Sequence, residues 1–420
     1  MKKLLTAAAA LAAVLIAAVA LLSLPRAERD GPPRVTGTCS TEGPLQGGAA
    51  TVPLTFAGPV PIGGFPRLRW TAEGTRDPLA VRALVLSGPG CAVGLVSAEI
   101  LLVPGALERA VSERTRDLGL GALVVGATHT HAGPGGYWDS FVAARIATGP
   151  YDPAILERIA DAMAQALRQA AAARRPVQAE AAEVDARALA RNRTGAAADG
   201  RLVVLRLRAG PEVVGEIASL GTHATLLGAQ QRLLSGDWPG ALMRLSAAPR
   251  LFFPGALGDQ SAAGPETASP ERYAEAVAAR IERAPLRPLA PALAAARAEV
   301  PLPWPSPGGA PRLLRPAAGR LLGGGMPAQA AATAVRIGPL LLVAVPAEPV
   351  EEVGRGWREA AGPGAEILSL CGAYAGYVET PERMARDDGE TARTYYGPAM
   401  AARLEAAIRM AAGAAAAPAR

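Results

Sequence analysis

Two of the three histidines in this chain lie two positions apart, in the segment VVGATHTHAGPGGYW at residues 124–138. The apolar residues before them predict a short buried strand, and the glycines and proline after them predict a turn. Side chains at positions i and i+2 of an extended backbone lie on the same face. We therefore expect His129 and His131 to project together from the end of a strand, with chance packing of two imidazoles as the alternative.

The third histidine and one glutamate also follow predicted strands. His223 ends the strand in IASLGTHATLLG, and Glu348 directly follows the apolar strand in LLLVAVPAEPVEEVG. Neutral imidazole nitrogen and carboxylate oxygen are ligands of Zn²⁺, and a catalytic zinc site keeps one position open for water. A buried carboxylate is unfavourable unless it is paired or ligated. The pattern predicts a zinc site, although Glu348 alone is equally well interpreted as an acid at a helix N-terminus.

Three further polar residues lie next to predicted strands or turns. Ser261 follows an apolar strand in LFFPGALGDQSAAGP, but this segment is not the G-x-S-x-G elbow of the serine hydrolases. A turn serine or helix cap is the alternative for Ser261. Tyr377 in YVETP is on its own typical of a core residue, and Asp237 in SGDWPG is typical of a helix N-cap.

The order of the predicted elements favours an α/β fold. A hairpin is predicted over 81–98, and a helix at 105–119 leads into the histidine strand. Asp152 and Pro153 predict the start of a helix that Pro176 ends. Later strands alternate with helices, which predicts a single layered domain with a mixed β-sheet flanked by helices and preceded by an N-terminal hydrophobic segment. Residues 301–330 are rich in proline and glycine, as in a lid, a binding edge or a disordered loop.

The N-terminus has the form of an export signal. Lys2 and Lys3 precede an apolar run over residues 4–24, which is long enough to cross a bilayer as a helix. We expect the chain to lie outside the cytoplasm, in the periplasm or at the cell surface, either anchored by this run or secreted after cleavage. The predicted organisation is a signal peptide or anchor at 1–25, a linker at 26–49, one domain at 50–412 and an Ala-rich tail at 413–420.

Charge and cysteine content narrow the class of protein. The net charge is +6 over 420 residues and is dispersed, so we expect no nucleic-acid partner. Cys39, Cys91 and Cys371 are an odd number, which allows at most one disulfide. The favoured interpretation of these cysteines is that they are small buried hydrophobic residues.

Taken in order, the motifs resemble the catalytic domain of the neutral ceramidases, which are zinc-dependent amidases that cleave N-acylsphingosine into fatty acid and sphingosine. The family pattern THTHSGPGGY is matched by THTHAGPGGY, and a partial match to NAGDVSPN is found in GALGDQSAAG. Five more segments match in the family's order, namely LGTHAT, SGDWPG, VAVPAEP, GAYAGYVETPERM and RTYYGP. The resemblance covers about residues 50–400.

The resemblance implies a role for each matched residue. The implied zinc ligands are His129, His223, Glu348 and Tyr377. His131 would lie beside the substrate carbonyl, Ser261 aligns with the family's active-site serine, and Arg193 in ARNRTG matches an arginine of the family. Two departures are visible, because a second family tyrosine falls on Gly389 and the serine segment lacks its Pro-Asn.

The function expected from this pattern is an exported zinc-dependent amidase that hydrolyses the N-acyl amide bond of ceramide or a related N-acyl lipid. Zinc-activated water is the expected nucleophile, with Ser261 positioning water or substrate, and an acyl-enzyme on Ser261 is the alternative. The expected partners are a lipid amide and a membrane surface or anchor. The departures support a second hypothesis, in which the same scaffold is a non-catalytic zinc- or lipid-binding protein.

Overall fold

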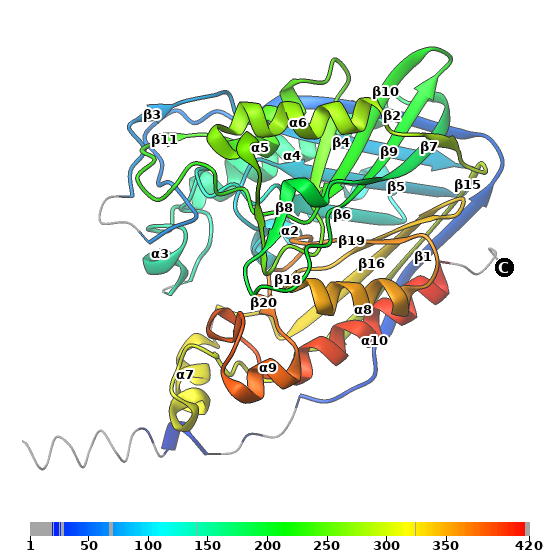
Figure 1. Cartoon of the computed structure of the whole chain (residues 1–420). Coiled ribbons are helices and arrows are strands. Elements are labelled where there is room, and N and C mark those ends of the chain that lie inside the picture. Colours follow the sequence, from blue (N-terminus) through cyan, green and yellow to red (C-terminus); the bar gives the residue numbers. More distant parts are fainter. Residues whose placement is uncertain are drawn as a thin grey trace, which may run out of the picture.

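Two β-sheets pack face to face between layers of helices in the computed structural model of the chain (Figure 1). The structure describes residues 19, 21–24, 26, 29–66, 70–140, 142–323 and 325–415. The α/β class predicted from the sequence is confirmed. The single predicted sheet is instead two main sheets, because apolar residues alternate toward two different cores along the same strands.

The larger sheet holds nine strands. Along β4, Val81, Ala83 and Val85 face one core while Leu84 and Leu86 face the other. The predicted hairpin is present as β4 and β5, which pair antiparallel. In spatial order the strands are β12 (Arg250–Pro254), β10 (Glu212–Leu220), β9 (Arg201–Ala209), β7 (Arg175–Asp185), β2 (Leu45–Pro53), β4 (Ala80–Gly88), β5 (Cys91–Ala98) and β6 (Ala122–Ala127), with β14 (Arg287–Pro288) paired to β7.

The smaller sheet holds five strands of mixed direction. Its order is β1 (Arg34–Glu42), β15 (Ala292–Pro301), β16 (Gln329–Ile337), β17 (Leu340–Ala344) and β19 (Ala365–Leu368). Three pairs of short strands lie outside both sheets, namely β3 (Gly74–Thr75) with β11 (Leu233–Leu234), β8 (Ala190–Asn192) with β13 (Gln260–Ala262), and β18 (Glu348–Pro349) with β20 (Tyr377–Val378). The last two pairs carry residues of the candidate site.

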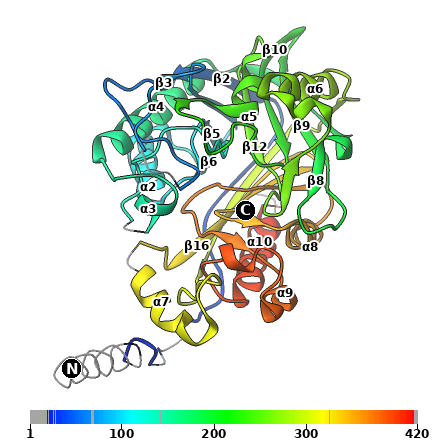
Figure 2. The ribbon, with the colours of Figure 1, turned by 60° about the vertical axis from the view of Figure 1, so that its left-hand side comes forward.

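Helices cover the outer faces of both sheets, as Figures 1 and 2 show. The larger sheet is covered by α2 (Gly105–Arg114), α4 (Pro153–Ala172), α5 (Asp237–Arg244) and α6 (Pro270–Glu282), and the smaller by α8 (Glu351–Ala361) and α10 (Ala399–Ala414). Asp152 caps α4 by accepting from the backbone N–H of Ala154 at 2.9 Å, as the sequence predicts. The remaining short helices are α3 (Ala143–Ile146), α7 (Arg315–Leu322), α9 (Pro381–Arg386), η1 (Arg116–Leu118), η2 (Arg187–Leu189), η3 (Pro265–Ala268), η4 (Arg312–Leu314) and η5 (Thr391–Arg393).

The predicted linker at residues 26–49 is wrong. Strand β1 pairs with β15 over eight residue pairs, and β2 lies between β4 and β7 inside the larger sheet. The glycines and threonines that suggested a linker are accommodated because β2 passes close under α4, and a Cβ at Gly48 would lie 2.3 Å from the backbone oxygen of Ala170. Residues 301–330 are likewise not a plain loop, since they contain η4 and α7.

The predicted signal or anchor at 1–25 lies mostly outside the described residues. Among the residues that the structure describes, none of the helices is both long and apolar enough to cross a membrane.

The interpretation of all three cysteines as unbridged hydrophobic residues is wrong for two of them. Cys39 on β1 and Cys91 on β5 form a disulfide that connects the two sheets, while Cys371 is free and buried. The two partners are 52 residues apart, and only the packing of one sheet on the other brings them together.

A buried carboxylate between the sheets predicts a pH dependence of stability. Burial raises the pKa of Glu366 to about 7, although Arg201 lies 3.3 Å from it and Ser219 donates a hydrogen bond at 3.0 Å. A carboxyl with a raised folded-state pKa binds more protons when folded, so the stability it contributes is complete below its unfolded pKa and is lost as pH rises through about 7.

We therefore expect the free energy of unfolding of the Glu366→Gln variant to fall less between about pH 5 and pH 8 than that of the parent, by about 3 kcal/mol. Urea denaturation at both pH values measures the difference, with Glu359→Gln, at an exposed position of α8, as the control. Parallel pH profiles for parent and Glu366→Gln would contradict the assignment.

Candidate metal centre

The first histidine of the site is held by the backbone of the loop after β5. His129 follows β6 and has a φ of +65°, which is uncommon for a residue with a Cβ. Its backbone N–H donates to the carbonyl of Ile100 at 3.0 Å. Its ring Nδ1 lies 2.8 Å from the carbonyl oxygen of Leu101, which only accepts, so Nδ1 carries the proton. The lone pair of Nε2 is therefore available to a ligand.

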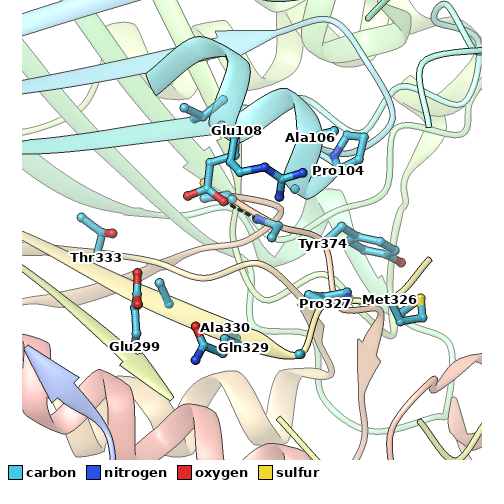
Figure 3. A pocket seen from close by; sticks show the side chains of 18 of the residues that line it. Pro104, Ala106, Glu108, Glu299, Met326, Pro327, Gln329, Ala330, Thr333 and Tyr374 are labelled. Atoms are coloured by element: carbon cyan, nitrogen blue, oxygen red, sulfur yellow. Dashed lines mark hydrogen bonds between the residues drawn. The ribbon is translucent and has the colours of Figure 1, made fainter. Parts of the chain in front are cut away.

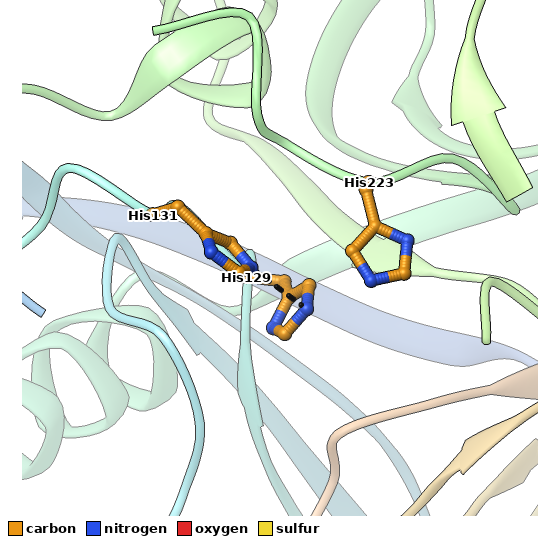
Figure 4. A group of neighbouring side chains, drawn as sticks. All are labelled: His129, His131 and His223. Carbon is orange, nitrogen blue, oxygen red and sulfur yellow. Dashed lines mark hydrogen bonds between the residues drawn. The ribbon is translucent and has the colours of Figure 1, made fainter. Parts of the chain in front are cut away.

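His223 is fixed in the same way by a different segment. Its Nδ1 lies 2.8 Å from the carbonyl oxygen of Gln260, and Trp238 donates from Nε1 to the carbonyl of His223 at 3.1 Å. A backbone bridge between Thr130 and Ala224 joins the two histidine loops. The ring centroids of His129 and His223 are 4.9 Å apart, and Figure 4 shows the two rings. Both histidines thus direct Nε2 toward one point, as in metal sites where a carbonyl orients the imidazole.

The acid and the tyrosine reach this point through the β18–β20 pair. Glu348 and Tyr377 lie opposite each other in the parallel pairing of these two strands. The hydroxyl of Tyr377 lies 2.8 Å from Nε2 of His223, and the hydroxyl of Tyr374 donates to Oε1 of Glu348 at 2.5 Å. Glu348 is 1% exposed, so its carboxylate is removed from solvent.

The distances between these atoms fit a tetrahedral metal. Ligands that are about 2.0–2.1 Å from a tetrahedral zinc ion lie about 3.3–3.4 Å from one another. Oε2 of Glu348 lies 3.2 Å from Nε2 of His129 and 3.3 Å from Nε2 of His223. Apart from these two contacts, this buried oxygen has no hydrogen-bond partner among the described residues. The donor set therefore fits a divalent metal.

His131 lies within reach of the same point. Its Nε2 is 3.2 Å from Nε2 of His129, and the three histidines have ligand atoms within 4.8 Å of one another. Figure 4 shows the rings of His129 and His131 close together, with His223 across from them. The geometry admits His131 in the ligand set as well as in the position beside the substrate that the resemblance implies.

The protonation states also suit metal binding, which requires neutral imidazole and ionised carboxylate. Burial lowers the pKa of His223 and, together with the neighbouring His129, lowers that of His131 well below the usual value. Burial raises the pKa of Glu348, but the adjacent imidazoles lower it, and the net pKa is well below the usual range. Burial raises the pKa of Tyr377 and Tyr374 well above 10, so both hydroxyls keep their protons.

Arg193 and Ser261 are brought to the edge of the histidine cluster by the β8–β13 pair. The Nη1 atom of Arg193 is 3.3 Å from Nδ1 of His223, and its Nε donates to Glu390 at 3.0 Å. Burial lowers the pKa of Arg193, but Tyr377 and Glu390 raise it, and the net shift is upward. Ser261 is half-buried and lies beside His223 in a backbone bridge. The structure thus gathers in one place all seven residues to which the resemblance gives a role.

Gly389 occupies a position where a side chain would be strained. Its φ is +60°, and an added Cβ would lie 2.3 Å from Oε2 of Glu379, whose other oxygen accepts from the backbone of Thr380. A tyrosine at this position would need an unfavourable backbone conformation and a shift of the Glu379 carboxylate, which agrees with the glycine found here.

Tyr374 is the main contact that the sequence analysis did not single out. It lies in the quoted segment GAYAGYVETPERM, but an isolated tyrosine after a strand is typical of a core residue, and its bond to Glu348 is visible only in three dimensions.

Tyr374 also lines a cavity of about 810 Å³ on the side of α2 and β16 (Figure 3). The titratable residues of this cavity partly neutralise each other, since Glu108 and Arg297 pair at 3.0 Å. None of the three histidines lines it. We therefore assign the metal site to the histidine cluster, where nitrogen and carboxylate lone pairs converge, and not to this cavity.

No protein-family profile and no curated protein matches the sequence. Solved structures do match. Neutral ceramidase from Pseudomonas aeruginosa matches with a TM-score of 0.75 and 19% identity over 88% of this chain and 74% of that chain. This chain has the neutral ceramidase fold. A ceramidase complexed with C2 matches with a TM-score of 0.76 and 18% identity over 88% of this chain and 75% of that one. The resemblance seen in the motifs is thereby confirmed at the level of the fold.

The Tyr374 hydroxyl provides a specific test of the metal centre in this ceramidase fold. Outer partners that orient metal ligands typically contribute about 10–100-fold to metal affinity. We expect Tyr374→Phe, which removes only the bond to Oε1 of Glu348, to weaken zinc binding by about tenfold or more. Competition with a chromophoric chelator measures this, and Tyr151→Phe, at an exposed tyrosine two residues before α4, is the matched control. Equal zinc affinity in the two variants would mean that Tyr374 does not orient the ligand.

Proposed function

We propose that this chain is an exported zinc-dependent amidase that hydrolyses the N-acyl amide bond of ceramide or a related N-acyl lipid. The observation that carries the proposal is the convergence of two oriented Nε2 atoms and the buried Oε2 of Glu348 at tetrahedral spacing. Its occurrence on the fold of neutral ceramidase from Pseudomonas aeruginosa supports the substrate class.

His129, His223 and Glu348 would hold the zinc, with Tyr377 beside them. When bound there, zinc would lower the pKa of a water molecule and polarise the amide carbonyl. The remaining residues then bind and orient the substrate.

Arg193 supplies a fixed positive charge at the edge of the histidine cluster, where it would stabilise negative charge that develops on the carbonyl oxygen. Glu390 holds the guanidinium in place through its 3.0 Å hydrogen bond. Neutral His131 would lie beside the scissile amide, and Ser261 would position water or substrate from the adjacent strand pair. If an acyl adduct were trapped on Ser261, the serine and not a water molecule would be the nucleophile.

Export is supported by two features. The apolar run at residues 4–24 follows two lysines, and the Cys39–Cys91 disulfide is of a kind that persists in oxidising compartments. If the run at residues 4–24 is retained as an anchor, it would hold the site near membrane lipids.

The proposal is tested with the full chain, purified in detergent with zinc and incubated with a panel of ceramides and N-acyl amines. Mass spectrometry quantifies released fatty acid, with and without a chelator. Release from ceramide that the chelator abolishes is the expected result. Release from another amide alone would discard ceramide as the substrate. Bound zinc with no release from any amide would overturn catalysis and favour a binding protein.

A further inference from the structure

Large apolar side chains are exposed together around α7. Leu313 is 89% exposed, Leu321 is 75% exposed and Leu314 is 42% exposed, all on η4 and α7. Leu21 and Leu24 are exposed by 63% and 54%. Five of the nine exposed large hydrophobic residues that the structure describes therefore belong to two short segments. We call these five leucines the leucine surface.

The two segments of the leucine surface are in direct contact. Arg320 on α7 donates to the carbonyl of Leu21 at 2.9 Å and to that of Leu24 at 2.6 Å. Figures 1 and 2 both place α7 beside the blue N-terminal segment, at an end of the molecule away from the two sheets. The two segments that carry these exposed leucines are therefore adjacent.

Arginines surround this surface. The guanidinium groups of Arg26 and Arg29 stack over the ring of Trp304 at 4.1 and 3.5 Å. Arg312 and Arg315 share the single carboxylate of Asp387, which leaves an excess of positive charge next to the leucines. Apolar side chains bordered by arginine are typical of elements that lie in the interface of an anionic bilayer.

The leucine surface is connected to the metal centre through backbone pairing. The chain that leads into α7 donates from Ser306 to the carbonyl of Tyr395 at 2.8 Å and from Gly308 to that of Thr394 at 2.9 Å. Thr394 in turn pairs with Tyr377 in a parallel bridge. The segment that carries the leucines is thus hydrogen-bonded to the segment that borders the metal centre.

We propose that η4 and α7 are a bilayer-contact element, which inserts Leu313, Leu314 and Leu321 into the surface of an anionic membrane next to residues 21–24. The element would hold the side of the protein that bears Tyr377 near the lipid. This inference rests on the proposed lipid-amide function for its purpose, but the contact itself is measured without hydrolysis.

The contact is tested with a bimane label on Leu313→Cys in the full chain, reconstituted into vesicles that contain phosphatidylglycerol. Cys371 is buried and the other two cysteines are bonded, so the introduced thiol reacts selectively. We expect lipids with a doxyl group near the headgroup to quench the label at position 313. The same label on Glu359→Cys, on the exposed side of α8, should not be quenched.

Equal quenching at the two positions would overturn the proposal. A blue shift at position 313 that depends on protein concentration and not on doxyl lipid would assign the surface to a second copy of the chain, and would also overturn it. Loss of quenching when phosphatidylcholine replaces phosphatidylglycerol is expected, because the arginines favour an anionic surface.

A functional measurement separates this proposal from the proposed function. We expect the triple change of Leu313, Leu314 and Leu321 to serine to lower hydrolysis of vesicle-borne ceramide by about tenfold relative to a short-chain amide in detergent. Leu245→Ser, at a leucine that is 50% exposed elsewhere on the surface, is the control and should not change this ratio. An unchanged ratio in the triple variant would count against the bilayer contact. Absence of hydrolysis in the parent would count against the proposed function only, since the quenching result stands independently.

Discussion

Replacing Glu348 by glutamine is expected to abolish stoichiometric zinc binding and to lower amide hydrolysis by about 100-fold or more. Among the described residues, the carboxylate of Glu348 supplies the only anionic oxygen that lies within 3.3 Å of Nε2 of both His129 and His223. A ligand should contribute at least as much to metal affinity as the outer partners that orient it, which contribute about 10–100-fold. Glutamine keeps the shape of the side chain and its contact with Tyr374. A loss of zinc binding in this variant would therefore be due to the missing negative charge.

Metal content is measured by atomic emission after gel filtration, and activity by release of fatty acid. Glu352→Gln is the matched control, because Glu352 lies four residues away and is half-exposed on α8. Retention of one zinc per chain in the Glu348→Gln protein would show that the histidines alone bind the metal.

Replacing Arg82 by methionine should destabilise the protein by about 3 kcal/mol, because it removes the close partner of a buried carboxylate and leaves only Arg244, 4.0 Å away. Arg82 contacts Glu99 at 2.6 Å, and their side chains are 6% and 0% exposed. Glu99 precedes Ile100 and Leu101, whose carbonyls accept from His129, so the ion pair also fixes the loop that orients this histidine.

Urea denaturation with the disulfide intact measures the effect. The double variant Arg82→Met/Glu99→Gln should recover most of the lost stability, because the unpaired charge is removed. Arg168→Met breaks a solvent-exposed pair with Asp117 and should leave the stability nearly unchanged. If Arg82→Met were no more harmful than Arg168→Met, the buried pair would not contribute to folding.

The local features of the site were predictable because they depend on short segments. The strand before His129, the turn after His131 and the apolar run before Glu348 follow from residue types within about ten positions of each site residue. The N-cap at Asp152 and the β4–β5 hairpin were predictable for the same reason, since turn and cap residues act on their immediate neighbours.

The linker prediction failed for a reason that is also physical. The small residues in β1 and β2 indicate a flexible segment when each of these segments is considered alone. In the folded chain these residues allow close approach, as at Gly48 under α4, so the same composition serves a packed strand.

Residue types and local patterns are enough to identify the side chains that can bind a metal and to predict that each of them follows a strand. The packing of distant segments places Oε2 of Glu348 3.2 Å from Nε2 of His129 and 3.3 Å from Nε2 of His223. The same packing brings Tyr374 to this carboxylate and Cys39 to Cys91. His129 and Glu348 are more than 200 residues apart, and the β18–β20 pairing and the packing of two sheets set their separation. Local patterns carry no information on such distances, because they arise from contacts between segments that meet only when the whole chain has folded.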